Sequence, residues 1–128
     1  MNEVVTNNMR YAFEFNAAAN VLEMQATGVM ENEFFPEVVR MFWQILEEND
    51  CHRAIIDYRN FEFTNSTIEI LKRPKIVLEI GGTRFFRLAM VVDAICEDYS
   101  FLETVYRNKG VDAKMFTDWQ EAFDWLQH

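Results

Sequence analysis

The last third of the chain alternates short apolar runs with amphipathic segments, which predicts alternating strands and helices. Residues 87–93 include five consecutive apolar positions. Such a run is too short for an isolated helix and is typical of a strand that is buried on both faces. A helix over residues 100–109 follows, because Ser100 and Glu103 have the spacing of a capping box and Gly110 supplies a stop.

A second strand and helix repeat this order. Residues 111–116 alternate apolar and polar, as in an edge or half-exposed strand. Thr117 or Asp118 then caps a final helix with an apolar stripe at Trp119, Ala122, Phe123 and Leu126. We expect Trp119, Phe123 and Leu126 to be buried against a sheet. The order strand, helix, strand, helix implies parallel crossovers.

The first half of the chain predicts a hairpin, a long helix and a third strand. Residues 9–15 and 21–29 alternate in polarity across an asparagine-flanked turn. Residues 33–48 carry a wide apolar stripe, with Pro36 tolerated in the first helical turn. Residues 53–58 are apolar in the middle, as in a central strand, and residues 59–65 are expected to form a loop.

A capping box at Ser66 and Glu69 begins the next helix. Pro74 is expected to end or kink it, so residues 75–80 are predicted as a second short helix. Residues 1–128 therefore form one α/β domain with a mixed five-stranded sheet, in which an N-terminal hairpin precedes parallel crossovers.

Composition narrows the range of partners. Half of the chain is apolar, with 12 Phe, 7 Met and 3 Trp, which suits either a dense core or a core with an apolar pocket or partner face. The net charge of −9 disfavours nucleic acids and anionic membrane surfaces. A protein or a neutral ligand is the expected partner.

The two cysteines and the two histidines predict no special chemistry. Cys51 and Cys96 lie in different elements and no secretory leader precedes them, so we expect free thiols in the cytoplasm. His52 and Cys51 point to opposite faces of an extended chain and cannot chelate one metal ion together. No apolar run is long enough to cross a bilayer. We expect no metal, no cofactor and no stable membrane insertion.

The order of elements resembles that of the STAS domain, in particular the SpoIIAA-like branch related to Sec14-type lipid-binding domains. The resemblance spans nearly the whole chain. Its most specific pieces are residues 55–57, residues 87–92, and the ending at 111–126 with Phe116-Thr117-Asp118, Glu121-Ala122 and Trp125-Leu126. It implies a small mixed sheet with helices largely on one side. These pieces are markers of a fold and imply little about reaction or ligand.

The resemblance also implies a possible phosphorylation site. In the anti-sigma-factor antagonists of this family, a partner kinase phosphorylates a serine that follows an aspartate at a helix N-terminus. The matching serine here is Ser66, where a phosphate would meet free backbone N–H groups and its charge would eject a docked partner. Asn65 stands in place of the aspartate, and Ile68 stands where glycine is usual. The alternative is that Ser66 only caps its helix.

We expect any single binding site at the carboxyl end of the third strand, where open α/β sheets place ligands. The candidates are Asp57, Tyr58, Arg59, Phe61, Asn65 and Ser66. A structural role is the alternative: Asp57 could equally accept hydrogen bonds from loop amides, and Arg59 could equally be a solvated loop residue.

Two classes of function remain. The first is a cytoplasmic protein-interaction or regulatory domain. The second is a carrier of a small apolar or lipid-like ligand, suggested by phenylalanines near element ends: Phe34, Phe35, Phe61, Phe63, Phe85 and Phe86. The pairs Phe34-Phe35 and Phe85-Phe86 also predict a homodimer. An enzyme ranks third, because spacing suggests no nucleophile and base.

Overall fold

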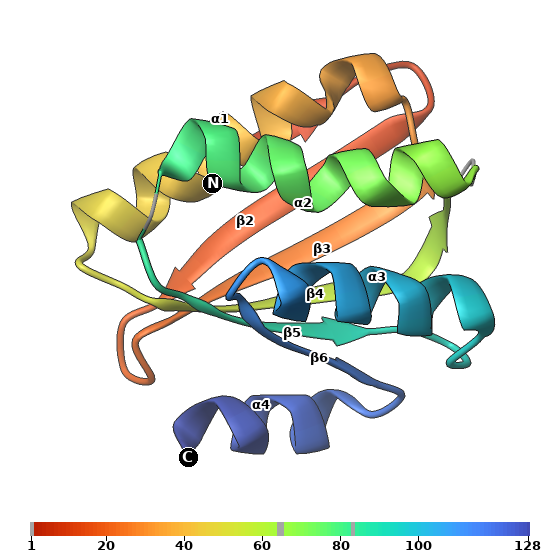
Figure 1. Cartoon of the computed structure of the whole chain (residues 1–128). Coiled ribbons are helices and arrows are strands. Elements are labelled where there is room, and N and C mark those ends of the chain that lie inside the picture. The colour runs from red at the N-terminus through yellow and green to blue at the C-terminus, as the bar shows by residue number, and fades with distance from the viewer. Residues whose placement is uncertain (1, 64–65, 83) are drawn as a thin grey trace.

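The computed structural model describes residues 2–63, 66–82 and 84–128, which form one sheet flanked by helices (Figure 1). The strands are β1 (Asn2–Val5), β2 (Met9–Asn16), β3 (Val21–Val29), β4 (Arg53–Glu62), β5 (Arg87–Val91) and β6 (Asp112–Phe116). The helices are α1 (Phe35–Glu48), preceded by the 3₁₀ turn η1 (Asn32–Phe34), then α2 (Thr67–Gly81), α3 (Glu97–Asn108) and α4 (Trp119–Gln127).

The six strands follow one another across the sheet in chain order. β1, β2 and β3 are antiparallel neighbours, whereas β3 to β6 are parallel. The mixed α/β sheet is as expected, but it has six strands rather than five. The additional strand, β1, is short and mostly exposed, so its sequence has no alternating apolar pattern to reveal it.

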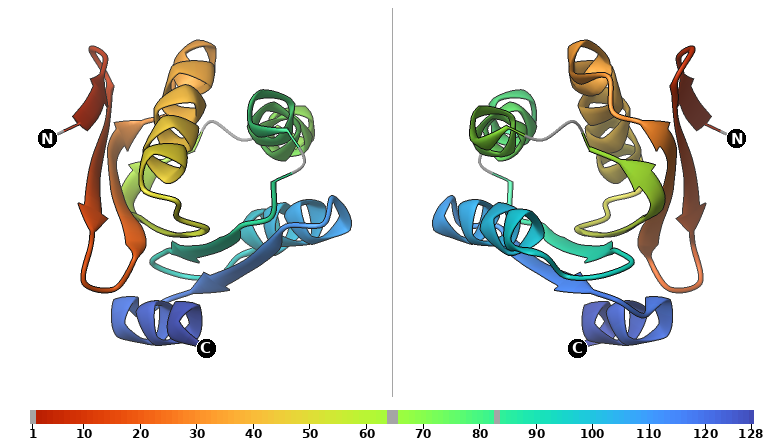
Figure 2. Two further views of the ribbon diagram at one scale, coloured as in Figure 1. Left: turned by 90° about the vertical axis from the view of Figure 1, so that its left-hand side faces the viewer. Right: turned by 90° about the vertical axis from the view of Figure 1, so that its right-hand side faces the viewer.

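Helices cover the two faces of the sheet unequally. α1, α2 and α3 lie on one face and α4 on the other (Figure 2), which confirms helices largely on one side. Successive residues of β4 show the consequence, because Ala54 and Ile56 join the core under the three helices while Ile55 joins the core under α4. Burial on both faces explains why residues 54–56 of β4 and residues 88–91 of β5 are continuously apolar.

β4 extends four residues beyond the predicted strand, so the prediction of a loop from residue 59 onward is wrong for Arg59–Glu62. The neighbouring β3 pairs with β4 as far as Glu62. Between the pairs Gln25 with Asp57 and Thr27 with Asn60, β4 advances three residues while β3 advances two. β4 therefore carries a β-bulge here, which the sequence pattern does not announce.

α2 runs without interruption through Pro74, so the predicted break into two helices is wrong. Packing against α1 holds the second half of α2 in place. The indole Nε1 of Trp43 donates a hydrogen bond to the Val77 carbonyl at 2.8 Å. A Cβ on Gly81 would lie only 1.8 Å from the Trp43 ring, so the close approach of the two helices requires glycine.

α3 begins at Glu97, three residues before the predicted cap at Ser100. Cys96 is the N-cap residue, and the acidic side chains of Glu97 and Asp98 occupy the first turn. Negative charge is favourable at the positive end of the helix dipole, which explains a start without a side-chain cap.

α4 begins as predicted, with the Asp118 carboxylate accepting a hydrogen bond from the Glu121 N–H at 2.9 Å. Its stripe is buried less completely than predicted. Leu126 is fully buried together with Ala122, whereas Trp119 and Phe123 are only partly buried at the side of the helix. α4 therefore docks through its two smaller stripe residues.

Candidate functional site

β1, β3, β4, β5 and β6 all have their carboxyl ends on the same side of the sheet, and α1, α2 and α3 begin there. We call this line of strand ends the carboxyl edge, and it lies on the right-hand side of Figure 1. Open α/β sheets place ligands outside this edge. The described candidate residues predicted from sequence lie at or near it.

Asp57 and Arg59 form an ion pair with each other on the α4 face of β4. Arg59 Nε lies 3.0 Å from Oδ1 of Asp57, and Nη2 lies 2.9 Å from Oδ2. The Arg59 backbone N–H also donates to Oδ1 at 2.9 Å. The pair lines an open groove of about 380 Å³ between Trp119 and the exposed faces of β2 and β3. Through these three hydrogen bonds both carboxylate oxygens of Asp57 are bound by Arg59 of the same strand. The Asp57 side chain therefore stabilises β4.

This contact changes the acidity of Asp57. Burial alone would raise the pKa of the carboxyl group, but the hydrogen bonds from the Arg59 side chain and backbone outweigh burial and lower the pKa below its usual value. Asp57 is therefore ionised at neutral pH and is poorly suited to act as a general acid.

Tyr58 and Phe61 lie on the opposite face of the sheet, so the structure does not gather the predicted candidates into one pocket. Both rings join the core under α1, α2 and α3. The Tyr58 ring centre is 5.5 Å from that of Phe61 and 4.7 Å from that of Phe63. The bulge in β4 brings positions 58 and 61 to the same face.

Ser66 is the N-cap of α2, and its Oγ accepts a hydrogen bond from the Glu69 N–H at 3.3 Å. The predicted capping role is confirmed. The side chain is exposed at the carboxyl edge. Asn65, the remaining candidate, lies outside the described residues.

Large apolar side chains are exposed mainly at the carboxyl edge. Among the described residues eight such side chains are exposed, and Phe85, at the opposite edge, is the exception. The other seven lie at the carboxyl edge or in the first two turns of α2 and α3: Val5, Val29, Phe34, Ile68, Leu71, Ile95 and Phe101. A concentration of this kind is typical of a surface that another molecule covers.

The same edge is acidic. The exposed acidic side chains there include Glu33, Glu62, Asp93, Glu97 and Asp98. Basic side chains near it pair with acidic neighbours: Arg10 with Glu3, Arg40 with Glu37, Arg59 with Asp57 and Lys72 with Glu69. The carboxyl edge therefore combines apolar groups with a negative field.

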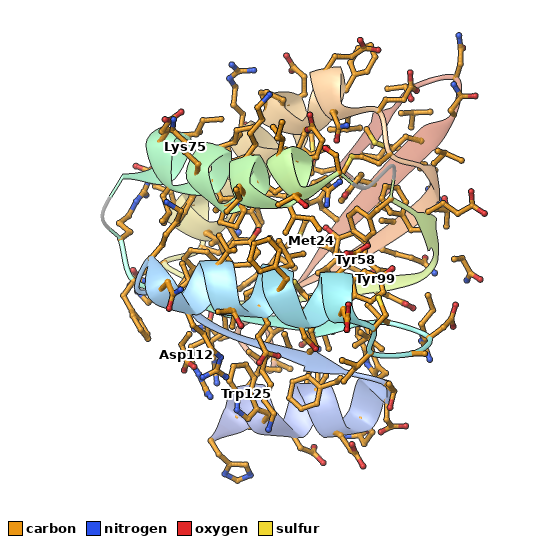
Figure 3. All side chains as sticks on the ribbon, turned by 45° about the vertical axis from the view of Figure 1, so that its right-hand side comes forward. Met24, Tyr58, Lys75, Tyr99, Asp112 and Trp125 are labelled. Carbon is orange, nitrogen blue, oxygen red and sulfur yellow. The ribbon has the colours of Figure 1, made fainter. Side chains whose placement is uncertain are left out.

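A separate cavity of about 40 Å³ lies between the sheet and the three helices. The residues that line it are mostly aliphatic and aromatic, together with Arg73 and three tyrosines: Tyr11, Tyr58 and Tyr106. Figure 3 shows two residues of the wall, Met24 and Tyr58, in the space between α2 and α3, with Tyr99 beside Tyr58.

Arg73 is a charged side chain in an apolar interior. It is only 4% exposed, and its guanidinium carbon lies 4.4 Å from the centre of the Phe63 ring. Burying a guanidinium costs free energy unless its surroundings stabilise the charge. The electron-rich ring face of Phe63 is one such surrounding group.

The tyrosine hydroxyls of the cavity hold their protons firmly. Burial raises the pKa of Tyr58 to about 12, and it raises those of Tyr11 and Tyr106 well above their usual value, whereas the positive charge of Arg73 acts in the opposite direction on all three. The hydroxyls of Tyr11 and Tyr58 are 3.2 Å apart and share a hydrogen bond. All three tyrosines are neutral hydrogen-bond donors at physiological pH.

Sequence reasoning named Tyr58 as a candidate but missed Arg73, Tyr11 and Tyr106 beside it. A signal exists, because Arg73 stands three residues after Ile70 and four before Val77, and both of these are buried. A basic residue in the apolar stripe of a helix marks an unusual buried charge.

The fold is SpoIIAA-like, as the sequence resemblance indicated. A solved structure of an uncharacterized protein of the DUF3478 family from Shewanella loihica PV-4, described as having a SpoIIAA-like fold, aligns with a TM-score of 0.62. The alignment covers 96% of this chain and 98% of that one at 19% sequence identity. This likeness shows the fold alone. No protein-family profile and no curated protein matches the chain.

Within residues 2–63, 66–82 and 84–128, no group of three or more His, Cys, Asp and Glu side chains is placed to hold a metal ion. None of the helices there has the length and apolarity required to cross a membrane. Cys51 is buried and Cys96 is exposed, and both are free thiols, as predicted.

Proposed function

We propose that this chain is a non-enzymatic cytoplasmic interaction domain that docks a basic, apolar segment of a protein partner on its carboxyl edge. The observation that carries the proposal is that seven of the eight large apolar side chains exposed in the described chain lie at this edge or in the first two turns of α2 and α3 beside it. Transfer of such side chains from water to an interface is the main driving force of association.

Charge selects the partner. The exposed acidic residues around the apolar groups repel anionic membranes and attract Lys and Arg side chains. A partner segment with alternating apolar and basic residues satisfies both properties of the edge. Free thiols and the net charge of −9 fit a protein-binding role in a reducing compartment.

A homodimer remains a prediction, but only one phenylalanine of each predicted pair is exposed to support it. Phe35 and Phe86 are buried in the core, whereas Phe34 and Phe85 are exposed at opposite edges. Two copies joined through their carboxyl edges would bring like charges together, which disfavours that arrangement. Sedimentation of the pure protein at twice 15.2 kDa would support a dimer through another surface.

The carrier of a small apolar or lipid-like ligand remains the alternative. The cavity of about 40 Å³ is far smaller than the pockets of roughly 300 Å³ or more that hold typical small-molecule ligands. A lipid chain would therefore require α2 or α3 to move away from the sheet. This volume favours protein interaction as the main function.

The test is a selection from a random peptide library displayed on phage, with purified protein as bait. We expect enriched peptides to combine Lys or Arg with apolar residues and to lose binding to Ile68→Ser. The matched control is Phe85→Ser, because Ile68 and Phe85 are 61% and 60% exposed but lie at opposite edges. Enrichment of acidic peptides, or peptides insensitive to Ile68→Ser, would contradict the proposal.

A further inference from the structure

The interior cavity carries a second inference, which is independent of the docking edge. Its wall has two parts with different chemistry. One part is aliphatic and aromatic, and includes Leu102 of α3 and Val77 of α2. The other consists of the Arg73 guanidinium and the hydroxyl-bearing residues Tyr11, Tyr58 and Tyr106.

The polar part suits a carboxylate. A guanidinium presents planar N–H donors that match the two oxygens of a carboxylate. Because Tyr11 and Tyr58 share one hydrogen bond, one of their two hydroxyl protons and that of Tyr106 can be donated to a ligand. The raised pKa values of the three tyrosines keep these donors protonated. Among the described residues that line the cavity, Arg73 is the charged side chain, so the wall is positive.

The size of the cavity limits the rest of the ligand. A volume of about 40 Å³ corresponds to about three water-sized spheres. Acetate, whose volume is about that of three water molecules, matches this space, and its methyl group matches the apolar part of the wall. Longer acids do not fit.

We propose that the cavity is a binding site for a monocarboxylate of the size of acetate, with the carboxylate held by Arg73 and the tyrosine hydroxyls and the methyl group packed among the apolar side chains. Bound in this way, the ligand would tie α2 and α3 to β2 and β4, because all four elements contribute to the wall. The site would then make the packing of these helices sensitive to the concentration of the acid.

The test uses methyl-labelled methionine NMR, because Met24 and Met90 line the cavity. Titration with sodium acetate should shift both methyl signals, while that of Met115, which does not line it, stays in place. Ethanol should bind at least tenfold more weakly, and ethylammonium should not bind. Equal shifts with acetate and ethylammonium, or no shift with acetate, would overturn the proposal.

Two variants separate a binding role of Arg73 from a structural one. Arg73→Met should lose at least tenfold in acetate affinity and bind ethanol unchanged, whereas Arg84→Met, on the exterior near Trp43, should bind acetate like the wild type. Unchanged acetate binding in Arg73→Met would overturn the proposal. If Arg73→Met does not fold, the comparison of acetate, ethanol and ethylammonium on the wild type still decides.

A chain-length series tests the size argument. Acetate should bind at least tenfold more tightly than butyrate in the wild type. Leu102→Ala should narrow this difference, because it enlarges the apolar part of the wall. Tighter binding of butyrate than of acetate to the wild type would overturn the assignment to small acids. Ile68→Ser should leave acetate binding unchanged, so failure of the docking proposal does not affect this result.

Discussion

Asp57 and Arg59 lie two residues apart on β4 and hold each other through two side-chain contacts of 2.9 and 3.0 Å. Alternate residues of a strand share a face, so the pair forms without any turn. It engages the carboxylate of Asp57, which is one of the binding candidates predicted from the sequence. The ion pair belongs to the architecture of the carboxyl edge.

Replacing Asp57 by Asn should lower the free energy of unfolding at pH 7 by about 1–2 kcal/mol, since a partly exposed ion pair with charge-assisted hydrogen bonds is lost. The pKa of Asp57 is lowered in the folded state. Its contribution is therefore fully present above the unfolded pKa of about 3.9 and is lost as the pH falls through the folded pKa. Urea denaturation of both proteins from pH 7 to pH 2 measures this. The same difference at both ends of the range would contradict the assignment.

The buried tyrosines of the cavity predict that the stability of the protein falls at high pH. Burial raises the pKa of Tyr58 to about 12 and raises those of Tyr11 and Tyr106 as well. An unfolded tyrosine ionises near pH 10, so stability should fall as the pH rises above about 10. Absorbance at the tyrosinate band should therefore stay low at pH 11 until the protein unfolds. Full tyrosinate absorbance at that pH with unchanged circular dichroism would show that the rings are accessible.

α4 supplies a test of docking on the second face. Leu126 is 1% exposed, so Leu126→Ala should cost about 2–5 kcal/mol of unfolding free energy. Phe123 is only partly buried, so Phe123→Ala should cost less than Leu126→Ala despite the larger side chain. Thermal denaturation of the two variants provides the comparison. The reverse order would mean that α4 is rotated on the sheet.

Much of the fold follows from local patterns in the sequence. An apolar run marks β5, alternation marks β6 and a cap marks the start of α4, and each of these signals acts within a few residues. The extension of β4 and the continuity of α2 were missed for one reason. Pairing with β3 holds Arg59–Glu62 in the sheet, and packing of Trp43 on Gly81 supports the helix beyond Pro74. Tertiary contacts of this kind override local signals.

The candidate sites were predictable in part. The topological argument placed Ser66 at the carboxyl edge, where the structure finds it as a helix cap. Sequence alone did not show the bulge in β4 that brings Tyr58 and Phe61 to one face of the sheet, opposite Asp57. Nor did it show that Ile68, Ile95 and Val5 lie along one edge, because these residues are distant in the chain and only the strand order and direction place them on the same side of the sheet.

Ser66→Asp tests the effect of added charge at the docking edge. Aspartate caps helices as well as serine does, so the unfolding midpoint should not change, whereas Ser66→Ala should lose about 1 kcal/mol. If the partner is basic, the new charge should strengthen binding about two- to fivefold at low salt. Calorimetric titration with a selected peptide measures this. Weaker binding would instead support a phosphate switch that releases the partner.

The most direct test of the docking edge is the dissociation constant of one selected basic peptide, measured against wild type, Ile68→Ser and Phe85→Ser. Loss of a buried isoleucine contact of about 1.5–3 kcal/mol should weaken binding to Ile68→Ser about tenfold or more. Phe85→Ser should bind within about twofold of the wild type, and added salt should weaken all three complexes because it screens the acidic edge. Equal dissociation constants for the two variants, or no dependence on salt, would contradict a partner site at the carboxyl edge.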